Sequence, residues 1–316
     1  MERHQSKDGP ERRFSTAPPQ LTHPSLKRRI GEKASAAIMP LIQRAARPFL
    51  GGESIADALC VAARLKREGL AATLSYWDVG GEDSQDIESV NLAAIAAMAP
   101  FANETYLSVK PPALRFSHQA ARNLASAAAL HGLRLHFDSH AADVADLQNA
   151  MIETMLGALG PQCLGTTLPG RQQRSLRDAE WATDHSLNVR VVKGEWPDPA
   201  DPKRDLRGGF LEVIDRLAGR SRHVAVATHD LALIREAIGQ LRAAGTACDI
   251  EVLLGMPISA LLTWAKQNAV AVRVYVPYGR GFIPNAIGVL RRNPRLALAI
   301  ARAQLRQFPA LFSPRR

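Results

Sequence analysis

The chain has 316 residues and a mass of 34.3 kDa, a length that suits one α/β barrel of about 250 residues or two smaller domains. Hydrophobic residues make up 46%, which excludes wholesale disorder, and aromatic residues only 5%, too few for a broad surface that stacks on single-stranded nucleic acid. The net charge of +10 lies at the ends, because residues 1–49 hold 10 basic and 4 acidic residues and residues 291–316 hold 7 basic and no acidic ones. The body is slightly acidic and is not expected to bind nucleic acid.

Residues 1–45 are expected to form a basic N-terminal extension that is partly disordered or helical. Pro, Ser, Thr and charged residues follow one another in residues 1–30 without a usable period. An Arg-rich targeting peptide is the alternative, and the acidic residues of this stretch make it less favoured. The folded domain is therefore placed at residues 46–305 and a basic tail at residues 306–316.

From residue 54 the chain alternates between short apolar runs and helical stretches. Ser54 is expected to cap a first helix that ends near Gly69. The apolar runs are typical of buried strands and cover residues 71–77, 105–109, 133–137, 162–168, 188–192, 223–228, 249–254 and 271–276. Later helical stretches cover residues 119–130, 143–156, 175–184, 210–217, 231–243 and 258–267.

Eight buried strands, each followed by a helix, predict a parallel sheet, because parallel strands need crossover connections. Eight is also the number that closes into a (β/α)₈ TIM-like barrel, which is the expected fold class: α/β. An open doubly wound sheet is the alternative. Such a sheet normally has a Gly-rich phosphate turn after its first strand, and the residues at 79–82, Val-Gly-Gly-Glu, do not form one.

Polar residues stand at the carboxyl ends of the expected strands, where barrel enzymes place their chemistry. A single such residue is as consistent with a solvated charge at the rim as with a binding site. Several of them at the same end of the barrel favour a binding site. Alternation along the fifth strand points Arg190 into the mouth, and Lys193 with Gly194 starts the following loop. Lys110, Arg190 and Lys193 are expected to supply positive charge for phosphates or a carboxylate. The pattern suits an anionic cofactor without saying which one.

The three cysteines lie at positions 60, 163 and 248, outside any Cys/His cluster. This spacing argues against a disulfide framework and a structural metal site and is typical of a reducing compartment. No apolar run approaches the roughly 20 residues that a membrane span needs. A cytoplasmic location is expected. Peripheral contact with the inner face of the membrane, through the Arg-rich helix expected at residues 296–305, is an alternative to that helix packing on the barrel.

At these residues the sequence resembles the proline dehydrogenase family, flavin enzymes built on a distorted (β/α)₈ barrel. The resemblance covers roughly residues 45–300, with the motifs in family order. The matching strings are Tyr106-Leu107-Ser108-Val109-Lys110, Val189-Arg190-Val191-Val192-Lys193-Gly194-Glu195-Trp196, Ala227-Thr228-His229-Asp230, Glu251-Val252-Leu253-Leu254-Gly255-Met256 and Val272-Arg273-Val274-Tyr275-Val276-Pro277-Tyr278-Gly279.

The resemblance implies non-covalent FAD and oxidation of L-proline to 1-pyrroline-5-carboxylate, in which a hydride passes to flavin N5 and electrons pass on to a quinone. It implies that Lys110 helps bind the substrate carboxylate, that Asp138 hydrogen-bonds near it, and that Tyr275 packs against the substrate ring. The residues it assigns to FAD are Arg190, Lys193, Gly194, Glu195, Trp196, Thr228 and His229.

The chain departs from the family pattern at four places, one of which is that no acidic residue follows Glu251 to supply the Glu of the family's last barrel helix. The arginine pair that clamps the proline carboxylate in the family is out of register here, and Arg291 with Arg292, about one helical turn later, is expected to replace it. A flavin-contacting Gln of the fourth strand corresponds to Gly165. A carboxylate after the third strand corresponds to His140.

These departures leave two alternatives to the oxidation of proline. One keeps FAD and changes the substrate to another cyclic or N-substituted amino acid. The other is a degenerate barrel that binds flavin poorly and serves as a binding module. The charges retained at the mouth favour an enzyme, since a scaffold has no physical need for them.

Overall fold

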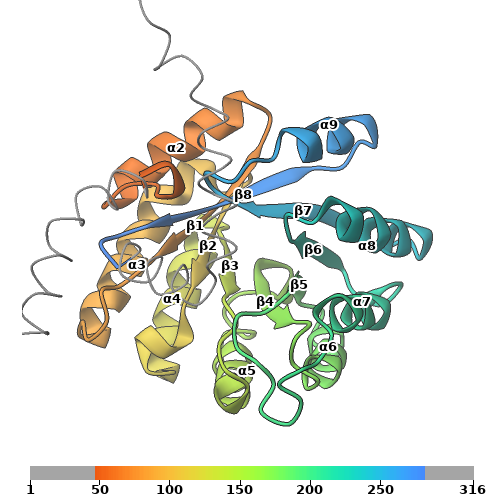
Figure 1. Ribbon diagram of the computed structural model, residues 1–316. Helices are drawn as coiled ribbons and strands as arrows, with labels where there is room; N and C mark the ends of the chain where they lie inside the picture. The colour runs from red at the N-terminus through yellow and green to blue at the C-terminus, as the bar shows by residue number, and fades with distance from the viewer. Residues whose placement is uncertain (1–46, 282–316) are drawn as a thin grey trace, which may run out of the picture. The chain divides into compact units, whose positions relative to one another are not determined.

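In the computed structural model, residues 47–281 are described, and they form a closed barrel of eight parallel strands in the order β1 to β8 (Figure 1). The expectation of a (β/α)₈ barrel is confirmed. The strands are β1 (Ala71–Tyr76), β2 (Thr105–Val109), β3 (Arg134–Phe137), β4 (Leu164–Pro169), β5 (Asn188–Val192), β6 (His223–Ala227), β7 (Ala247–Leu253) and β8 (Val272–Tyr278).

Helices alternate with the strands and cover the outside of the barrel (Figure 1). The α-helices are α2 (Ile55–Arg67), α3 (Ser84–Met98), α4 (His118–His131), α5 (Ala145–Glu153), α6 (Ser175–Asp184), α7 (Leu206–Leu217), α8 (Leu231–Ala243) and α9 (Ser259–Gln267). Short 3₁₀ turns are η1 (Arg47–Phe49), η2 (Ala99–Phe101), η3 (Pro111–Leu114), η4 (Ala142–Val144) and η5 (Pro161–Cys163). None of the helices in this part of the chain combines the length and hydropathy that a membrane crossing requires.

The expected elements agree with the observed ones to within a few residues, with one omission. Ser54 caps α2 as expected: its Oγ accepts from Asp57 N at 3.2 Å, and Asp57 Oδ2 accepts in return from Ser54 N at 3.0 Å. The omission is α3, whose Ala-rich end lacks a clear polar stripe. Asp83 caps α3 by accepting from Gln85 N. The expected helix at 296–305 lies outside the described residues.

The two faces of the strands differ sharply in polarity. Outward residues such as Leu107, Phe137 and Val191 are fully or almost fully buried and pack against the helices, so the hydrophobic core lies between sheet and helices. Inward residues are polar, Ser108 and His136 among them, and are equally buried. Barrel interiors are usually filled by branched apolar side chains. The polar interior here therefore marks where the chemistry of this chain is concentrated.

The barrel closes where β1 pairs with β8 over six residues. The segment just before α2 reinforces this seam, because Gly51 N donates to Pro277 O at 2.7 Å and Gly279 N donates to Gly52 O at 3.0 Å. Two parts of the chain more than 200 residues apart are thus hydrogen-bonded side by side.

Candidate active site

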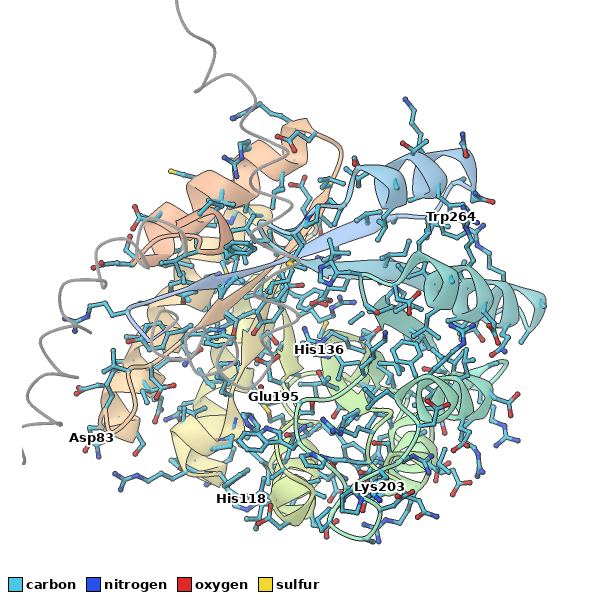
Figure 2. The ribbon with its side chains drawn as sticks, in the orientation of Figure 1. Asp83, His118, His136, Glu195, Lys203 and Trp264 are labelled. Carbon is cyan, nitrogen blue, oxygen red and sulfur yellow. The ribbon has the colours of Figure 1, made fainter. Side chains whose placement is uncertain are left out.

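A polar cavity opens at the carboxyl ends of the strands, and we call it the mouth cavity. Its volume is about 560 Å³, within the range of small-molecule sites. In Figure 2, His136 lies inside the ring of strands, whereas Asp83, His118 and Lys203 lie on its outside. The polar residues of the cavity wall are Asp78, Lys110, Asp138, Ser139, His140, Thr167, Gln172, Arg190, Glu195, Thr228, His229, Glu251 and Tyr275.

The structure brings most of the sequence-predicted site residues to this one cavity. Those that line it are Lys110, Asp138, Arg190, Gly194, Glu195, Trp196, Thr228, His229 and Tyr275. Lys193 stands beside it and is paired with Asp230 at 3.2 Å. Arg291 and Arg292 lie outside the described residues.

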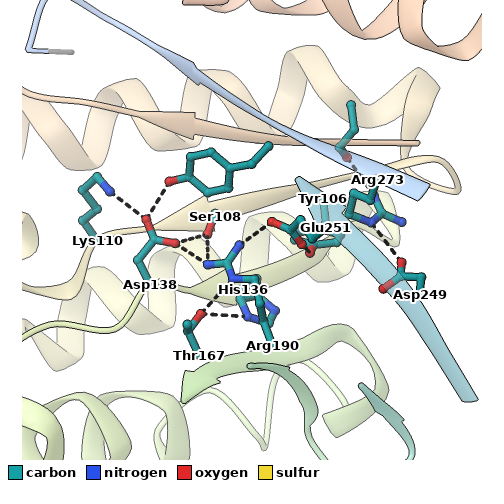
Figure 3. Close-up of polar contacts among 12 residues, drawn as sticks. Tyr106, Ser108, Lys110, His136, Asp138, Thr167, Arg190, Asp249, Glu251 and Arg273 are labelled. Carbon is teal, nitrogen blue, oxygen red and sulfur yellow. Dashed lines mark hydrogen bonds and ion pairs between the residues drawn. The ribbon is translucent and has the colours of Figure 1, made fainter. Parts of the chain in front are cut away.

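Asp138 is the centre of the network in the cavity (Figure 3). Its Oδ2 accepts from Lys110 Nζ and from the Tyr275 hydroxyl, each at 2.7 Å. Its Oδ1 accepts from Ser108 Oγ at 2.7 Å and from Arg190 Nη2. Three strands and the loop after β2 are thereby tied to one carboxylate, which fixes the Lys110 ammonium and the Tyr275 hydroxyl in place.

The pKa shifts agree with a permanently charged network. Burial opposes ionisation of Asp138, but Lys110 and Arg190 outweigh it and hold the pKa of that carboxyl well below its usual range. Burial likewise opposes protonation of Lys110, and the Asp138 carboxylate overcomes it and raises the pKa of Lys110. Burial and the Asp138 charge raise the pKa of Tyr275 to about 12, so this phenol stays protonated and donates.

Arg190 lies at the inner end of the cavity with its side chain only 4% exposed (Figure 3). Its Nη1 donates to Glu251 Oε1 at 2.7 Å, its Nη2 donates to Asp138, and its Nε donates to Thr167 Oγ1 at 3.1 Å. Burial opposes the charge, but the two carboxylates outweigh it and raise the pKa of Arg190. The guanidinium is therefore charged and held on three sides.

The positive charges expected at the mouth are present, and each of them has a carboxylate partner. Lys110, Arg190 and Lys193 each make an ion pair with a carboxylate. The inner network of Lys110, Arg190, Asp138 and Glu251 contains two cations and two anions. Sequence alone shows which cations reach the mouth, but their partners come from strands far apart along the chain. The end of the cavity at Arg190, a guanidinium flanked by two carboxylates, therefore suits a neutral group better than an anion.

The rim around β6 offers donors for an anion. His229 Nε2 accepts from Leu253 N at 3.0 Å, which leaves its Nδ1 as the protonated nitrogen of the neutral ring. Burial, together with Lys193, lowers the pKa of His229, so the ring is neutral. Helix α8 begins directly after Asp230, and Lys193 lies against that residue. The donors of this rim suit a phosphate. The amino end of α8 itself is already capped by Asp230, whose Oδ1 accepts from Leu233 N at 3.2 Å.

The loop after β5 borders the other side of the cavity. Gly194 has a φ of +95°, which favours glycine, and a Cβ there would lie 2.7 Å from Pro169 Cβ. Arg171 Nη1 donates to Glu195 O at 3.1 Å and ties this loop to the one after β4. Trp196 remains 45% exposed at the edge of the cavity.

The structure shows which positions of β4 reach the cavity. A Cβ at Gly165 would overlap His136 Nδ1, so position 165 faces the interior below the cavity. Thr167, two residues later, lines the cavity instead. Its Oγ1 accepts from Arg190 and lies 3.1 Å from His136 Nε2. In this fold Thr167 and Pro169, and not Gly165, are the β4 residues that line the cavity.

Sequence reasoning gave no role in the network to Glu251, Tyr106 or Trp77. Glu251 stood out as a strand end but without an assigned role, although it contacts Arg190 and accepts a hydrogen bond from the Tyr106 hydroxyl. The Nζ of Lys110 lies 4.2 Å from the ring centroid of Trp77. The Nε1 of Trp77 donates to the Tyr275 hydroxyl at 3.4 Å. A charged residue inside a buried strand is the signal that points to Glu251.

His140 stands in the wall where the resemblance expects a carboxylate. Its Nε2 is buried without a hydrogen-bond partner, and its carbonyl oxygen accepts from Gln172 Nε2 at 3.1 Å. Burial and the nearby Lys110 lower the pKa of His140 to about 4, so this imidazole is neutral.

The donor set fits a flavin dinucleotide in two parts. The inner end, with its compensated charges and with Val192 and Leu253 in the wall, suits a largely neutral ring system. The rim with Thr228, His229 and Lys193 suits a diphosphate. The residues present therefore match the cofactor implied by the sequence motifs.

A parallel barrel with a polar cavity at the carboxyl ends of its strands defines the class: an α/β-barrel protein that holds a small molecule. The chain is 26% identical over 278 residues to the proline dehydrogenase of Deinococcus radiodurans, a match that covers 82% of this chain and 89% of that protein. It is 24% identical over 278 residues to proline dehydrogenase 1 of Bacillus subtilis subsp. natto, covering 83% and 91%.

Solved structures show the same fold. Proline utilization A from Bdellovibrio bacteriovorus, inactivated by N-propargylglycine, superposes with a TM-score of 0.70 at 16% identity and covers 82% of this chain. A mutant of the Bradyrhizobium japonicum protein gives a TM-score of 0.64 at 20% identity and covers 81%. The chain spans about a third of the length of these larger proteins, 33% and 31%. No family model matches the chain. The resemblance to the proline dehydrogenase family is confirmed by these relatives.

Proposed function

We propose that this protein is a proline dehydrogenase-like oxidoreductase that binds FAD and oxidises L-proline to 1-pyrroline-5-carboxylate in proline catabolism. One observation supports this most: in a chain similar to proline dehydrogenases, a single polar network at the mouth cavity joins Lys110, Asp138, Arg190 and Tyr275. Each of these side chains is held by at least one charged partner, so the site is organised before a ligand enters.

The substrate is held by charge and by packing. Lys110 stays protonated and attracts the amino-acid carboxylate, while the ring of Tyr275 packs against the substrate ring. Asp138 orients both of these groups through its two hydrogen bonds at 2.7 Å. Arg291 and Arg292, outside the described residues, are proposed to complete the grip on the carboxylate.

The nitrogen of the substrate must lose its proton before the carbon beside it can be oxidised. The Lys110 ammonium repels a second cation nearby and so favours the neutral amine. Tyr275 remains a donor, because its pKa of about 12 keeps its proton in place at neutral pH. Neither Asp138 nor Glu251 needs to exchange a proton for the site to work.

The cofactor is proposed to contact seven residues: Arg190, Lys193, Gly194, Glu195, Trp196, Thr228 and His229. When bound, FAD supplies the redox chemistry, since its flavin N5 accepts the hydride of the substrate and its electrons pass on to a quinone. Arg190 would lie against the flavin ring at the inner end, and the rim donors would hold the diphosphate. Gly194 has a positive φ and no side chain, which would let the backbone approach the cofactor closely.

A second candidate keeps FAD and changes the substrate to another cyclic or N-substituted amino acid. The observation that favours it is His140, a neutral imidazole in the cavity wall where the resemblance expects a carboxylate. A non-catalytic barrel is disfavoured, because the buried pairs of Arg190 with Asp138 and Glu251 cost desolvation that a scaffold has no reason to bear.

The test begins with the visible spectrum of the purified full-length protein, where bound oxidised flavin is expected. Anaerobic addition of L-proline should then bleach that spectrum. Lys110→Met should keep the flavin and slow the bleaching at least tenfold. Lys66→Met, which removes a surface cation paired with Glu104 at 2.6 Å, is the matched control and should bleach at the normal rate.

Each outcome decides between the candidates. A protein that contains no flavin and does not take up added FAD contradicts the proposed function. A yellow protein that is bleached by other cyclic amino acids and not by proline establishes the second candidate. Normal bleaching of Lys110→Met removes Lys110 from the substrate site.

A further inference from the structure

Glu251 is a buried carboxylate at the inner end of the mouth cavity, and no role follows for it from the family motifs. Its side chain is 2% exposed. Its Oε1 accepts from Arg190 Nη1 at 2.7 Å, and its Oε2 accepts from the Tyr106 hydroxyl (Figure 3). Each oxygen of the carboxylate is thus bonded, and its charge lies directly on the guanidinium.

The position of Glu251 makes it the second anion on Arg190. Asp138 already contacts the opposite nitrogen of the guanidinium, and it shares its charge with Lys110. Without Glu251, the two cations Lys110 and Arg190 would face one anion, and the inner end of the cavity would be positive. With Glu251 the charges balance. In a buried site such a unit of charge is screened far less than in water.

We propose that Glu251 is a positioning residue that offsets the charge of Arg190 and thereby limits how strongly the site stabilises reduced relative to oxidised flavin. The inference rests on the proposed function. Reduction adds negative charge to the flavin ring, and a net positive neighbour would stabilise the reduced form. A guanidinium that is balanced by two carboxylates gives much less of this stabilisation.

Glu251→Gln tests this proposal, because it keeps the size of the side chain and one acceptor oxygen but removes the charge. The ratio of the affinities for reduced and oxidised FAD is measured by titrating the apoprotein with each form. The midpoint potential of the bound flavin is measured by equilibration with a reference dye. The ratio should rise at least tenfold, and for a two-electron couple a tenfold change corresponds to about 30 mV. Neither readout depends on turnover.

Two control variants separate charge from structure. Glu251→Asp keeps the charge and should leave the ratio within threefold of wild type. Asp249→Asn removes a carboxylate from the same face of β7. Asp249 lies two residues before Glu251, further from the mouth, and its Oδ2 is 3.5 Å from Arg273 Nε. It should also change the ratio less than threefold, because Asp249 makes no ion pair with Arg190 in the described structure.

A variant at a second position should change the ratio of the affinities for reduced and oxidised FAD in the opposite direction. It tests the proposal even if Glu251→Gln does not fold. Thr167 Oγ1 accepts from Arg190 Nε at 3.1 Å, so Thr167→Asp adds a third carboxylate beside the guanidinium. The preference for reduced FAD should then fall below that of wild type. Loss of FAD binding in a folded Glu251→Gln variant would overturn the inference, since Glu251 would be needed for binding itself.

The failures of the two proposals are distinguishable. Wild-type protein that does not bind FAD overturns the proposed function and this inference with it. Wild-type and Glu251→Gln proteins that bind FAD with the same ratio overturn the inference alone. A shift of Thr167→Asp in the same direction as Glu251→Gln also overturns it, because added and removed charge must act oppositely.

Discussion

The imidazole of His136 fills the space that a side chain at position 165 would take. A Cβ built on Gly165 overlaps His136 Nδ1, and that nitrogen is buried without a hydrogen-bond partner. Burial, reinforced by Arg190, lowers the pKa of His136 well below its usual value, so the ring is neutral. His136 on β3 and Gly165 on β4 are therefore complementary in size: the imidazole occupies the space beside a residue that has no side chain.

We expect Gly165→Ala to destabilise the protein by about 1–3 kcal/mol, because overpacking of a rigid interior displaces side chains. Gly165→Ala should cost less stability when it is added to His136→Ala than when it is made in the wild-type protein, because the imidazole that it would displace is then absent. Urea unfolding of the four proteins measures the coupling. Additive effects of the two changes would show that the residues do not compete for the same space. Gly239→Ala, in α8 with open space around its Cβ position, is the matched control and should not destabilise.

Removal of Arg190 should be costly for a reason apart from catalysis. Arg190→Ala leaves Glu251 and Asp138 buried without the guanidinium that they share, and loss of one partner of a buried pair costs about 3–5 kcal/mol. Combining it with Glu251→Gln should restore part of the stability, as measured by urea unfolding. Arg207→Ala, which breaks the exposed pair with Glu236, should cost at most about 1 kcal/mol. A double variant no more stable than Arg190→Ala would contradict the charge-balance explanation.

The free energy of unfolding should fall as the pH is lowered from about 6.5, the ordinary pKa of histidine. Burial lowers the pKa of His140 to about 4, and burial also lowers the pKa of His136, His223 and His229. Between these pH values the unfolded chain binds protons that the folded chain does not, so stability rises with pH.

Urea unfolding at several pH values between about 4 and 7.5 measures this slope. The lower limit is the pKa of about 4 for His140. The upper limit lies about one unit above the ordinary pKa of histidine, where the imidazole is neutral. His140→Gln should reduce the slope. His118→Gln, at an exposed position of α4, is the control. An equal reduction by both variants would show that the buried position of His140 is not the cause.

The barrel was predictable because its elements alternate regularly in the sequence. Apolar runs separated by helix ends predict parallel strands, and β5 and α6 have the expected bounds. Helix α3 was not predicted, since its Ala-rich half is apolar on several sides and packs against both α4 and β2. Propensity and packing then give no clear periodicity.

The site was predictable only to the level of which side chains reach the mouth. Position at a strand end suffices to place Asp138 and Tyr275 in the cavity. It does not show that Glu251 compensates Arg190, because that pairing depends on the tilt and stagger of strands on different sides of the barrel. The same limit explains the β4 register, where only the neighbouring His136 shows that Gly165 lies below the cavity.

The seam between β1 and β8 has a consequence for how the chain folds during synthesis. Gly51 and Gly52 bond to Pro277 and Gly279, so the partners of the first strand are among the last described residues to leave the ribosome. Until then one edge of the growing sheet has no neighbour and offers open backbone groups to other chains. We expect nascent chains stalled before residue 272 to aggregate or to recruit chaperones, and chains extended past residue 279 to become resistant to protease.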